Sequence, residues 1–126
     1  MNPSKMLSLK GKVFSGTGEG AKFTELPWAK QQIIEKIGFI PYPGTLNIKL
    51  TKNPLKNAKG IEISPVKDFC RSKCFYAYLD NLKCAIVIPE VEDYPENVIE
   101  VIAPVNLREK FKLKDGDLVE VNVIVG

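Results

Sequence analysis

The sequence predicts an all-β fold with minor α, a closed β-barrel that carries one main helix. Several short segments have the alternation of strands, one segment has the period of a helix, and strands and helices do not follow one another in a regular rhythm. The last observation disfavours a doubly wound α/β sheet. At 126 residues and 14.1 kDa the chain has the size of one domain, so we expect residues 1–126 to form a single domain.

The first elements are a short strand, a glycine-dense loop and a helix. Residues 10–15 indicate the strand and residues 16–21, GTGEGA, the loop. Proline suits the first turn of a helix, so Pro27 marks a start, and Gly38 marks the end. Between them lies an apolar face with the helical period, formed by Ile33, Ile34 and Ile37 with Trp28 nearby.

The remaining elements are mostly strands. After the turn PYPG at 41–44, residues 45–50 alternate strictly, with Leu46, Ile48 and Leu50 on one face. Residues 51–60 read as a loop. Further strands are predicted at 61–66, at 75–79 and 82–89 as a hairpin turning at Asp80-Asn81, at 98–103, and at 118–125 after a turn at 114–117. Residues 104–111 indicate one or two helical turns.

The composition excludes several kinds of chemistry. The chain has no histidine, which removes Ser-His-Asp triads, Cys-His dyads, histidine bases and histidine-ligated zinc. The three cysteines, Cys70, Cys74 and Cys84, are odd in number and poorly spaced for zinc, so we expect buried or idle thiols. Any reaction must use carboxylates, hydroxyls, backbone amides and a hard metal ion.

Charge and hydropathy suggest a soluble protein that binds small molecules. The net charge is +3 and the basic residues are scattered, which suits a phosphorylated ligand better than a nucleic-acid duplex. No apolar run approaches the roughly 20 residues that cross a bilayer, and residues 1–12 lack the apolar centre of a signal peptide. We therefore expect a cytoplasmic location, with no membrane partner and no nucleic acid.

The loop at 16–21 is a candidate anion site. It matches the letters of a dinucleotide fingerprint, but that motif must open a helix directly, and the predicted helix starts only at Pro27. It is not a Walker A loop, because no Gly-Lys-Ser/Thr closes it. Glycines allow close approach of the backbone to a ligand, and consecutive amides can bind an anion. A simple surface turn is the alternative.

Two further segments carry candidate ligands. Strand alternation places Thr45 and Asn47 on the same face, and two such oxygens suit Mg²⁺, although an exposed polar strand face would look the same. In residues 100–108, EVIAPVNLR, Pro104 ends a strand and presents a short helix whose first amides are unsatisfied, and Arg108 is a forked phosphate donor. A capped corner with a surface arginine is the plain alternative.

Together the blocks SGTGEG, PYPGTLN and IAPVNLREKFKLKDGD resemble the archaeal CTP-dependent riboflavin kinases, in the right order and over nearly the whole chain, from about Lys10 to Val125. The stretch between Thr51 and Lys83 carries little of the match. The resemblance implies a six-stranded cradle-loop barrel. It also implies an enzyme that transfers the γ-phosphoryl group of CTP to riboflavin, giving FMN and CDP.

The resemblance also implies the roles of individual residues. Thr45 and Asn47 would bind one Mg²⁺ ion, Glu100 would contact the flavin, and a second flavin contact, usually a hydroxyl residue in the family, falls at Glu92 by ungapped counting. The nucleotide would be held by two segments, namely Gly16, Thr17, Gly18, Glu19, Gly20 and Ala21, and Val105, Asn106, Leu107 and Arg108.

Phosphoryl transfer depends on positioning and charge neutralisation, which amides, a metal ion and an arginine supply without histidine. Glu100 is the candidate base for the ribityl hydroxyl. Two alternatives stay open: a nucleic-acid-binding barrel of the swapped-hairpin type, disfavoured because the chain lacks a basic stripe, and a flavin-binding protein without kinase activity. Swapped-hairpin proteins are also usually much shorter and dimeric, whereas we expect a monomer here.

Overall fold

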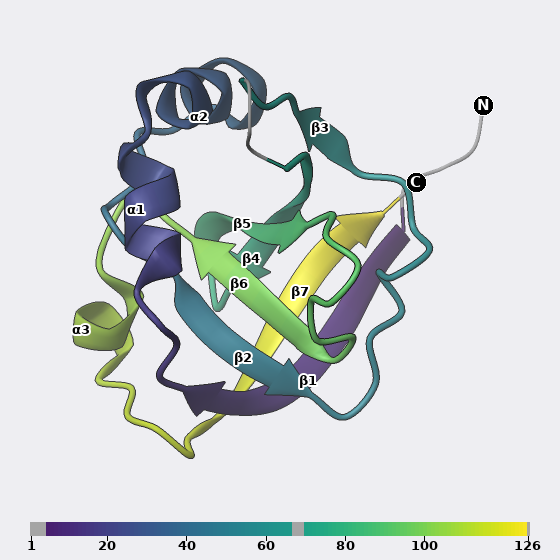
Figure 1. Cartoon of the computed structure of the whole chain (residues 1–126). Helices are drawn as coiled ribbons and strands as arrows, with labels where there is room; N and C mark the ends of the chain where they lie inside the picture. The colour runs from purple at the N-terminus through teal and green to yellow at the C-terminus, as the bar shows by residue number, and fades with distance from the viewer. Residues whose placement is uncertain (1–4, 67–69, 126) are drawn as a thin grey trace.

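The computed structural model of the chain describes residues 5–66 and 70–125, with the backbone alone for residues 19–21. Within these ranges, strands pair antiparallel in one sheet of order β3-β4-β5-β6-β2-β1-β7, and a further pairing of β4 with β7 closes six of them into a barrel (Figure 1). The strands are β1 (Lys5–Phe14), β2 (Leu46–Leu50), β3 (Ile61–Ile63), β4 (Ser72–Leu79), β5 (Leu82–Pro89), β6 (Val98–Ile102) and β7 (Leu118–Val125). The predicted barrel is confirmed, with β3 as an extra strand beside β4.

Alternation along the strands fills the barrel. In β2, Leu46, Ile48 and Leu50 are buried, while Asn47 is half-buried and Lys49 exposed on the opposite face, as predicted. The interior cluster continues through the other strands with side chains such as Ile86, Ile99 and Val121. Because every strand of the barrel contributes inward apolar residues, the core lies along the barrel axis.

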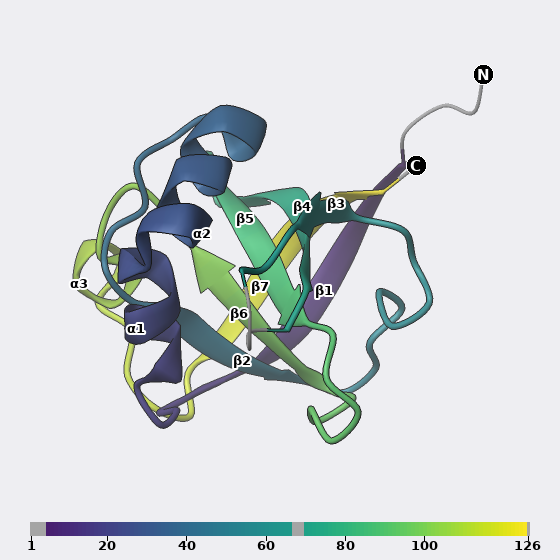
Figure 2. The same ribbon diagram turned by 45° about the horizontal axis from the view of Figure 1, so that its top comes forward.

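The strand β5 is buried on both faces, and this reveals a second core. Ala85 and Val87 lie with Ile33 and Ile37 in a separate cluster outside the barrel. The helices that provide this cover are α2 (Pro27–Gln32) and the π-helix η1 (Ile33–Ile37), which ends at Gly38 with φ +100°. Figures 1 and 2 show α1 and α2 on one side of the barrel. The predicted helix from Pro27 to Gly38 is confirmed, although its second half is a π-helix.

The expectation that residues 16–21 form a loop throughout is wrong. The helix α1 (Glu19–Glu25) begins directly after Gly18, which has φ +88° and lies at the N-cap position. Glycine adopts this left-handed conformation without steric cost, so the chain can turn straight from β1 into a helix. A helix therefore does follow the glycines directly, but the strand before them belongs to an antiparallel barrel and not to a βαβ unit.

The C-terminal half follows the prediction closely. β4 and β5 form the hairpin, and Asp80 in its turn has φ +54°. The helical turn is shorter than expected, because α3 (Leu107–Phe111) starts three residues after Pro104. In the described part of the chain, no helix is long and apolar enough to span a membrane.

Candidate functional site at the junction of two hollows

The centre of the site is a polar cluster on the outer face of β2 and β6. Thr45 lies directly before β2, and the register pairs Asn47 with Glu100. The Thr45 hydroxyl donates to Glu100 Oε1 at 3.1 Å and lies 3.4 Å from Asn47 Oδ1. The structure therefore brings Thr45 and Asn47, the predicted metal ligands, next to Glu100, the predicted flavin contact and base. The Thr45 hydroxyl lies within hydrogen-bonding distance of both an amide oxygen and a carboxylate oxygen.

A polar hollow of about 190 Å³ opens on one side of this cluster. Thr45 and Arg108 both line it, together with the turn before β2 and the corner after β6. The whole of the predicted segment Val105–Arg108 belongs to its wall, with Tyr42, Pro43, Gly44, Leu46, Val101 and Ala103. An arginine beside backbone amides is a suitable environment for phosphate groups.

An apolar hollow of about 400 Å³ opens on the other side, beneath the helices. Its aromatic wall is formed by Phe23 of α1 and Trp28 of α2, whose rings meet edge to face with centroids 6.1 Å apart. Glu100 and Thr45 supply polar groups at its boundary. The remaining lining consists of Lys22, Leu26, Cys70, Ser72, Val87 and Pro89. A largely apolar cavity of this size with a few polar groups is typical of a small-molecule binding site.

Thr45 lines both hollows. A ligand in the polar hollow and a ligand in the apolar hollow would therefore meet at its hydroxyl, beside Glu100 and Asn47. Such an arrangement is what a direct group transfer between two bound molecules requires, since the reacting atoms must lie a few ångströms apart. The two-sided geometry was not visible in the sequence, because the two walls come from segments far apart in the chain.

Gly16 lies directly against the side chain of Asn47. A Cβ atom built at Gly16 would lie 2.3 Å from Asn47 Nδ2, so the amide of Asn47 packs where any other residue would have its side chain. Gly18, by contrast, has open space around it and is required for its positive φ. The predicted nucleotide segment thus divides into an irregular part at 16–18 and the first turn of α1 at 19–21.

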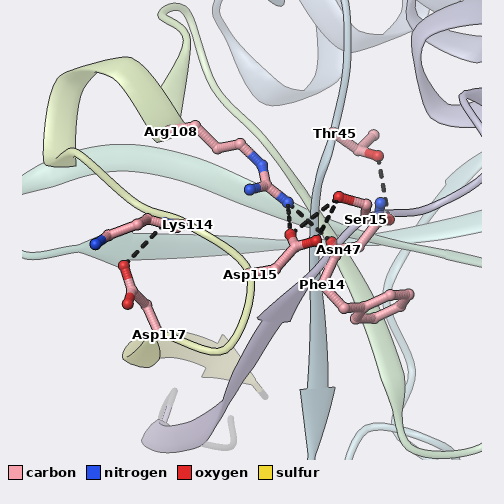
Figure 3. Close-up of polar contacts among 8 residues, drawn as sticks. All are labelled: Phe14, Ser15, Thr45, Asn47, Arg108, Lys114, Asp115 and Asp117. Carbon is pink, nitrogen blue, oxygen red and sulfur yellow. Dashed lines mark hydrogen bonds and ion pairs between the residues drawn. The ribbon is translucent and has the colours of Figure 1, made fainter.

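Arg108 is not the isolated surface arginine of the plain alternative. Its Nη2 atom donates to the Phe14 carbonyl at 3.1 Å and to Asp115 Oδ1 at 2.8 Å (Figure 3). Ser15 donates to both oxygens of the same Asp115 carboxylate. Hydrogen bonds from Arg108 and Ser15 lower the pKa of Asp115, since they stabilise its charged form.

One of the amides that were expected to be free after Pro104 has a partner. Asn106 is the N-cap of α3, and its side chain accepts a hydrogen bond from the amide of Glu109 at 3.2 Å. An N-cap residue satisfies one of the amides that would otherwise be open at a helix start. Asn106 therefore caps α3. Arg108, two residues further along the chain, lines the polar hollow with its positive charge.

The structure places Glu92 in the lining of a different hollow from Glu100, and its predicted flavin contact stays a prediction. Glu92 lines a third hollow, with Lys56 and Lys73, while Glu100 lines the apolar one. The residue of this loop that contacts the site is Tyr94, whose hydroxyl donates to Glu100 Oε2 at 2.7 Å. Burial raises the pKa of Tyr94, and the Glu100 carboxylate raises it further. Sequence reasoning missed Tyr94, although a tyrosine six residues before the candidate base was available as a signal.

The structure buries two of the three cysteines, in line with the expectation of buried or idle thiols. All three are free, with Cys74 and Cys84 buried and Cys70 exposed. Burial raises the pKa of both Cys74 and Cys84 to about 12. Among the described residues, no group of three or more acidic or cysteine side chains is placed to bind a metal ion.

Comparison with known proteins identifies the relatives of this chain. The family model CTP-dep_RFKase, described as domain of unknown function DUF120, matches residues 13–123. The chain is also 43% identical over 129 residues to a riboflavin kinase of Archaeoglobus fulgidus, which covers 94% of this chain. The chain belongs to the archaeal CTP-dependent riboflavin kinase family. The predicted resemblance is thereby confirmed.

Other riboflavin kinases show similar identity to this chain. The riboflavin kinases of Pyrobaculum aerophilum and Methanosarcina barkeri are 42% and 38% identical to this chain, each over 94% of it. The chain spans only 55% to 61% of the length of these three relatives. The similarity therefore concerns the barrel domain, and the roles of its individual residues stay predictions.

Proposed function

We propose that this chain is a CTP-dependent riboflavin kinase, which transfers the γ-phosphoryl group of CTP to the 5′-hydroxyl of riboflavin and gives FMN and CDP. The observation that carries the proposal is the position of Thr45, which lines both the polar and the apolar hollow. Family membership supports the same reaction, since the relatives are named riboflavin kinases. The cytidine preference follows from the family name alone.

The two hollows suit the two substrates. The isoalloxazine ring is flat and largely apolar, and it fits the apolar hollow with Phe23 and Trp28. The triphosphate fits the polar hollow, where Arg108 provides positive charge and the backbone at 105–107 provides amides. The glycine segment at 16–18 would close the nucleotide site beside Asn47.

The residues present also suit one Mg²⁺ ion. Thr45 Oγ1 and Asn47 Oδ1 are hard oxygen donors 3.4 Å apart, and Mg²⁺ prefers a few protein oxygens with the rest from water and phosphates. Thr45 uses its hydroxyl proton on Glu100, so its lone pairs are free to face a cation. When bound there, the ion would neutralise charge on the phosphate oxygens of the nucleotide.

Glu100 is the proposed base. The ribityl hydroxyl oxygen attacks the γ-phosphorus and forms the new P–O bond, its proton passes to Glu100, and the bond to CDP breaks with its electrons on the leaving oxygen. Tyr94 and Thr45 each donate to one oxygen of Glu100, so the carboxylate is fixed in orientation. Both substrates bind within one chain in this scheme, and we propose that it acts as a cytoplasmic monomer.

The test is turnover of riboflavin with each of CTP, ATP, GTP and UTP in the presence of Mg²⁺, with FMN as the measured product. We expect FMN with CTP and little with ATP. Equal use of all four nucleotides would contradict the cytidine preference but leave the kinase activity. Riboflavin binding without any FMN formation would contradict the kinase proposal and favour a flavin-binding protein.

A further inference from the structure

The turn between α3 and β7 contacts the proposed nucleotide site through one carboxylate. Asp115 accepts hydrogen bonds from Ser15 at 2.9 Å to Oδ1 and 2.8 Å to Oδ2, and from Arg108 at 2.8 Å (Figure 3). Ser15 is the residue directly before the glycine segment, and Arg108 lines the polar hollow. A single side chain therefore joins the two segments that would hold the nucleotide.

Backbone hydrogen bonds hold this turn in place. The amide of Val13 donates to the carbonyl of Asp117 at 2.9 Å, and the amide of Gly116 donates to the carbonyl of Val13 at 2.8 Å. The turn is thus attached to the end of β1 independently of the Asp115 side chain. Loss of that side chain should leave the turn where it is.

The geometry leaves donors of Arg108 available for a ligand. Its contacts with Phe14 and Asp115 both use Nη2, and a guanidinium has three more N–H groups on its other two nitrogens. Because the guanidinium is planar, fixing one nitrogen at two points restricts the direction in which the other donors point. Both partners are partly exposed, so the ion pair itself contributes little to folding stability. The effect of the contact with Asp115 is to fix the orientation of the Arg108 guanidinium.

We propose that Asp115 is a positioning residue of the nucleotide site. It holds the Arg108 guanidinium and the Ser15 end of the glycine segment in a fixed relation, and it does not itself touch the nucleotide. The inference rests on the proposed function, in which Arg108 and the glycine segment bind the triphosphate.

Simple electrostatics predicts the opposite effect. A carboxylate near an anion-binding site repels the anion, so its removal should tighten nucleotide binding if charge alone mattered. Positioning predicts weaker binding when the carboxylate is lost, because Arg108 becomes free to adopt other rotamers. The sign of the change in affinity therefore separates the two accounts.

The experiment compares CTP binding by calorimetry, without riboflavin, in the wild type, Asp115→Ala, Asp115→Asn and Asp117→Asn. Asp117 is a matched control, because it lies in the same turn, carries the same charge and accepts from the amide of Lys114 rather than from Arg108. We expect about tenfold weaker binding for Asp115→Ala, about 1.4 kcal/mol, and a smaller loss for Asp115→Asn, which keeps one acceptor. Asp117→Asn should stay within about twofold of the wild type.

Riboflavin binding, followed by flavin fluorescence, should be unchanged in all three variants, which shows that the fold is intact. Unchanged or tighter CTP binding in Asp115→Ala, with normal binding by the wild type, would overturn the positioning role alone. Equal weakening in Asp117→Asn would overturn it as well, because the effect would then come from the turn as a whole and not from the Asp115 side chain. If the wild type bound no CTP, the proposed function would fail and this inference with it.

Discussion

The two hollows that meet at Thr45 are built in different ways. The polar hollow and its surroundings depend on hydrogen bonds among partly exposed groups, such as those of Arg108 and Asp115. The apolar hollow is bounded by Phe23 and Trp28, which pack against the second core cluster, and by Val87, which is part of that cluster.

Because of this difference, ligand binding can be changed without changing folding stability only around the polar hollow. Removing an exposed hydrogen bond changes folding free energy little, so substitutions around the polar hollow should alter nucleotide binding and turnover while melting stays similar. Around the apolar hollow the same side chains bury surface in the folded protein, so substitutions there should affect riboflavin binding and stability together.

The largest effect is expected from Gly16→Ala. The new methyl group would lie 2.3 Å from Asn47 Nδ2, and the end of the Asn47 side chain must move away. Turnover should fall by about tenfold or more if Asn47 helps to hold the metal, with little change in melting temperature.

A double-variant cycle tests that explanation. Asn47→Ala should cause a similar loss, and combining it with Gly16→Ala should add little, because both changes remove the same contact. Full additivity of the two losses in turnover would show that Gly16 acts by some other means.

On the apolar side, Trp28→Leu removes the aromatic face that the flavin would contact but keeps a large apolar side chain. We expect riboflavin to bind about tenfold more weakly, from the loss of ring contacts, and the melting temperature to fall as well. CTP affinity should not change. A loss of CTP affinity equal to the loss of riboflavin affinity would remove the distinction between the hollows.

A smaller effect is expected from Tyr94→Phe, which removes only the hydroxyl that donates to Glu100. Turnover should fall several-fold while riboflavin affinity stays within about twofold, because the ring is kept and only the carboxylate loses its restraint. Tyr76→Phe is the matched control, since it removes a hydroxyl bonded to the carbonyl of Lys36, away from the site. Equal losses in both variants would indicate a general structural effect.

The smallest effect concerns the thiols. At pH 8 a thiol reagent should modify only Cys70, because burial raises the pKa of Cys74 and Cys84 to about 12 and these thiols stay protonated and covered until the pH approaches that value. Since Cys70 lines the apolar hollow, bound riboflavin should slow its modification. Mass spectrometry counts the labels. Rapid labelling of all three cysteines in the native protein would contradict the burial.

Local patterns predicted most of this fold. The alternation of residues 45–50 fixed which side chains of β2 enter the barrel, and the apolar period from Pro27 predicted the covering helix. The helix α1 was missed because its sequence has no apolar period and its start depends on the φ of Gly18. The start of α3 was placed at Pro104 instead of Leu107 for a similar reason, because it depends on the cap that Asn106 forms.

The site was predictable in part. Strand alternation placed Thr45 and Asn47 on one face, but only the β2–β6 register brings Glu100 beside them. The contacts of Asp115 with Ser15 and Arg108 join residues up to 100 positions apart, and no short motif encodes such a pairing. Glu92 was chosen by counting along the chain, whereas the course of the loop decides that Tyr94 reaches Glu100.

The proposed transfer requires that the two bound substrates meet at Thr45. Thr45→Val keeps the shape of the side chain and removes its oxygen, so the most direct measurement is turnover of this variant together with its separate affinities for CTP and riboflavin. Thr51→Val, in the exposed loop after β2, is the control. We predict turnover at least about tenfold lower, with riboflavin affinity within about threefold of the wild type and normal melting. Wild-type turnover in a folded Thr45→Val protein would contradict the account.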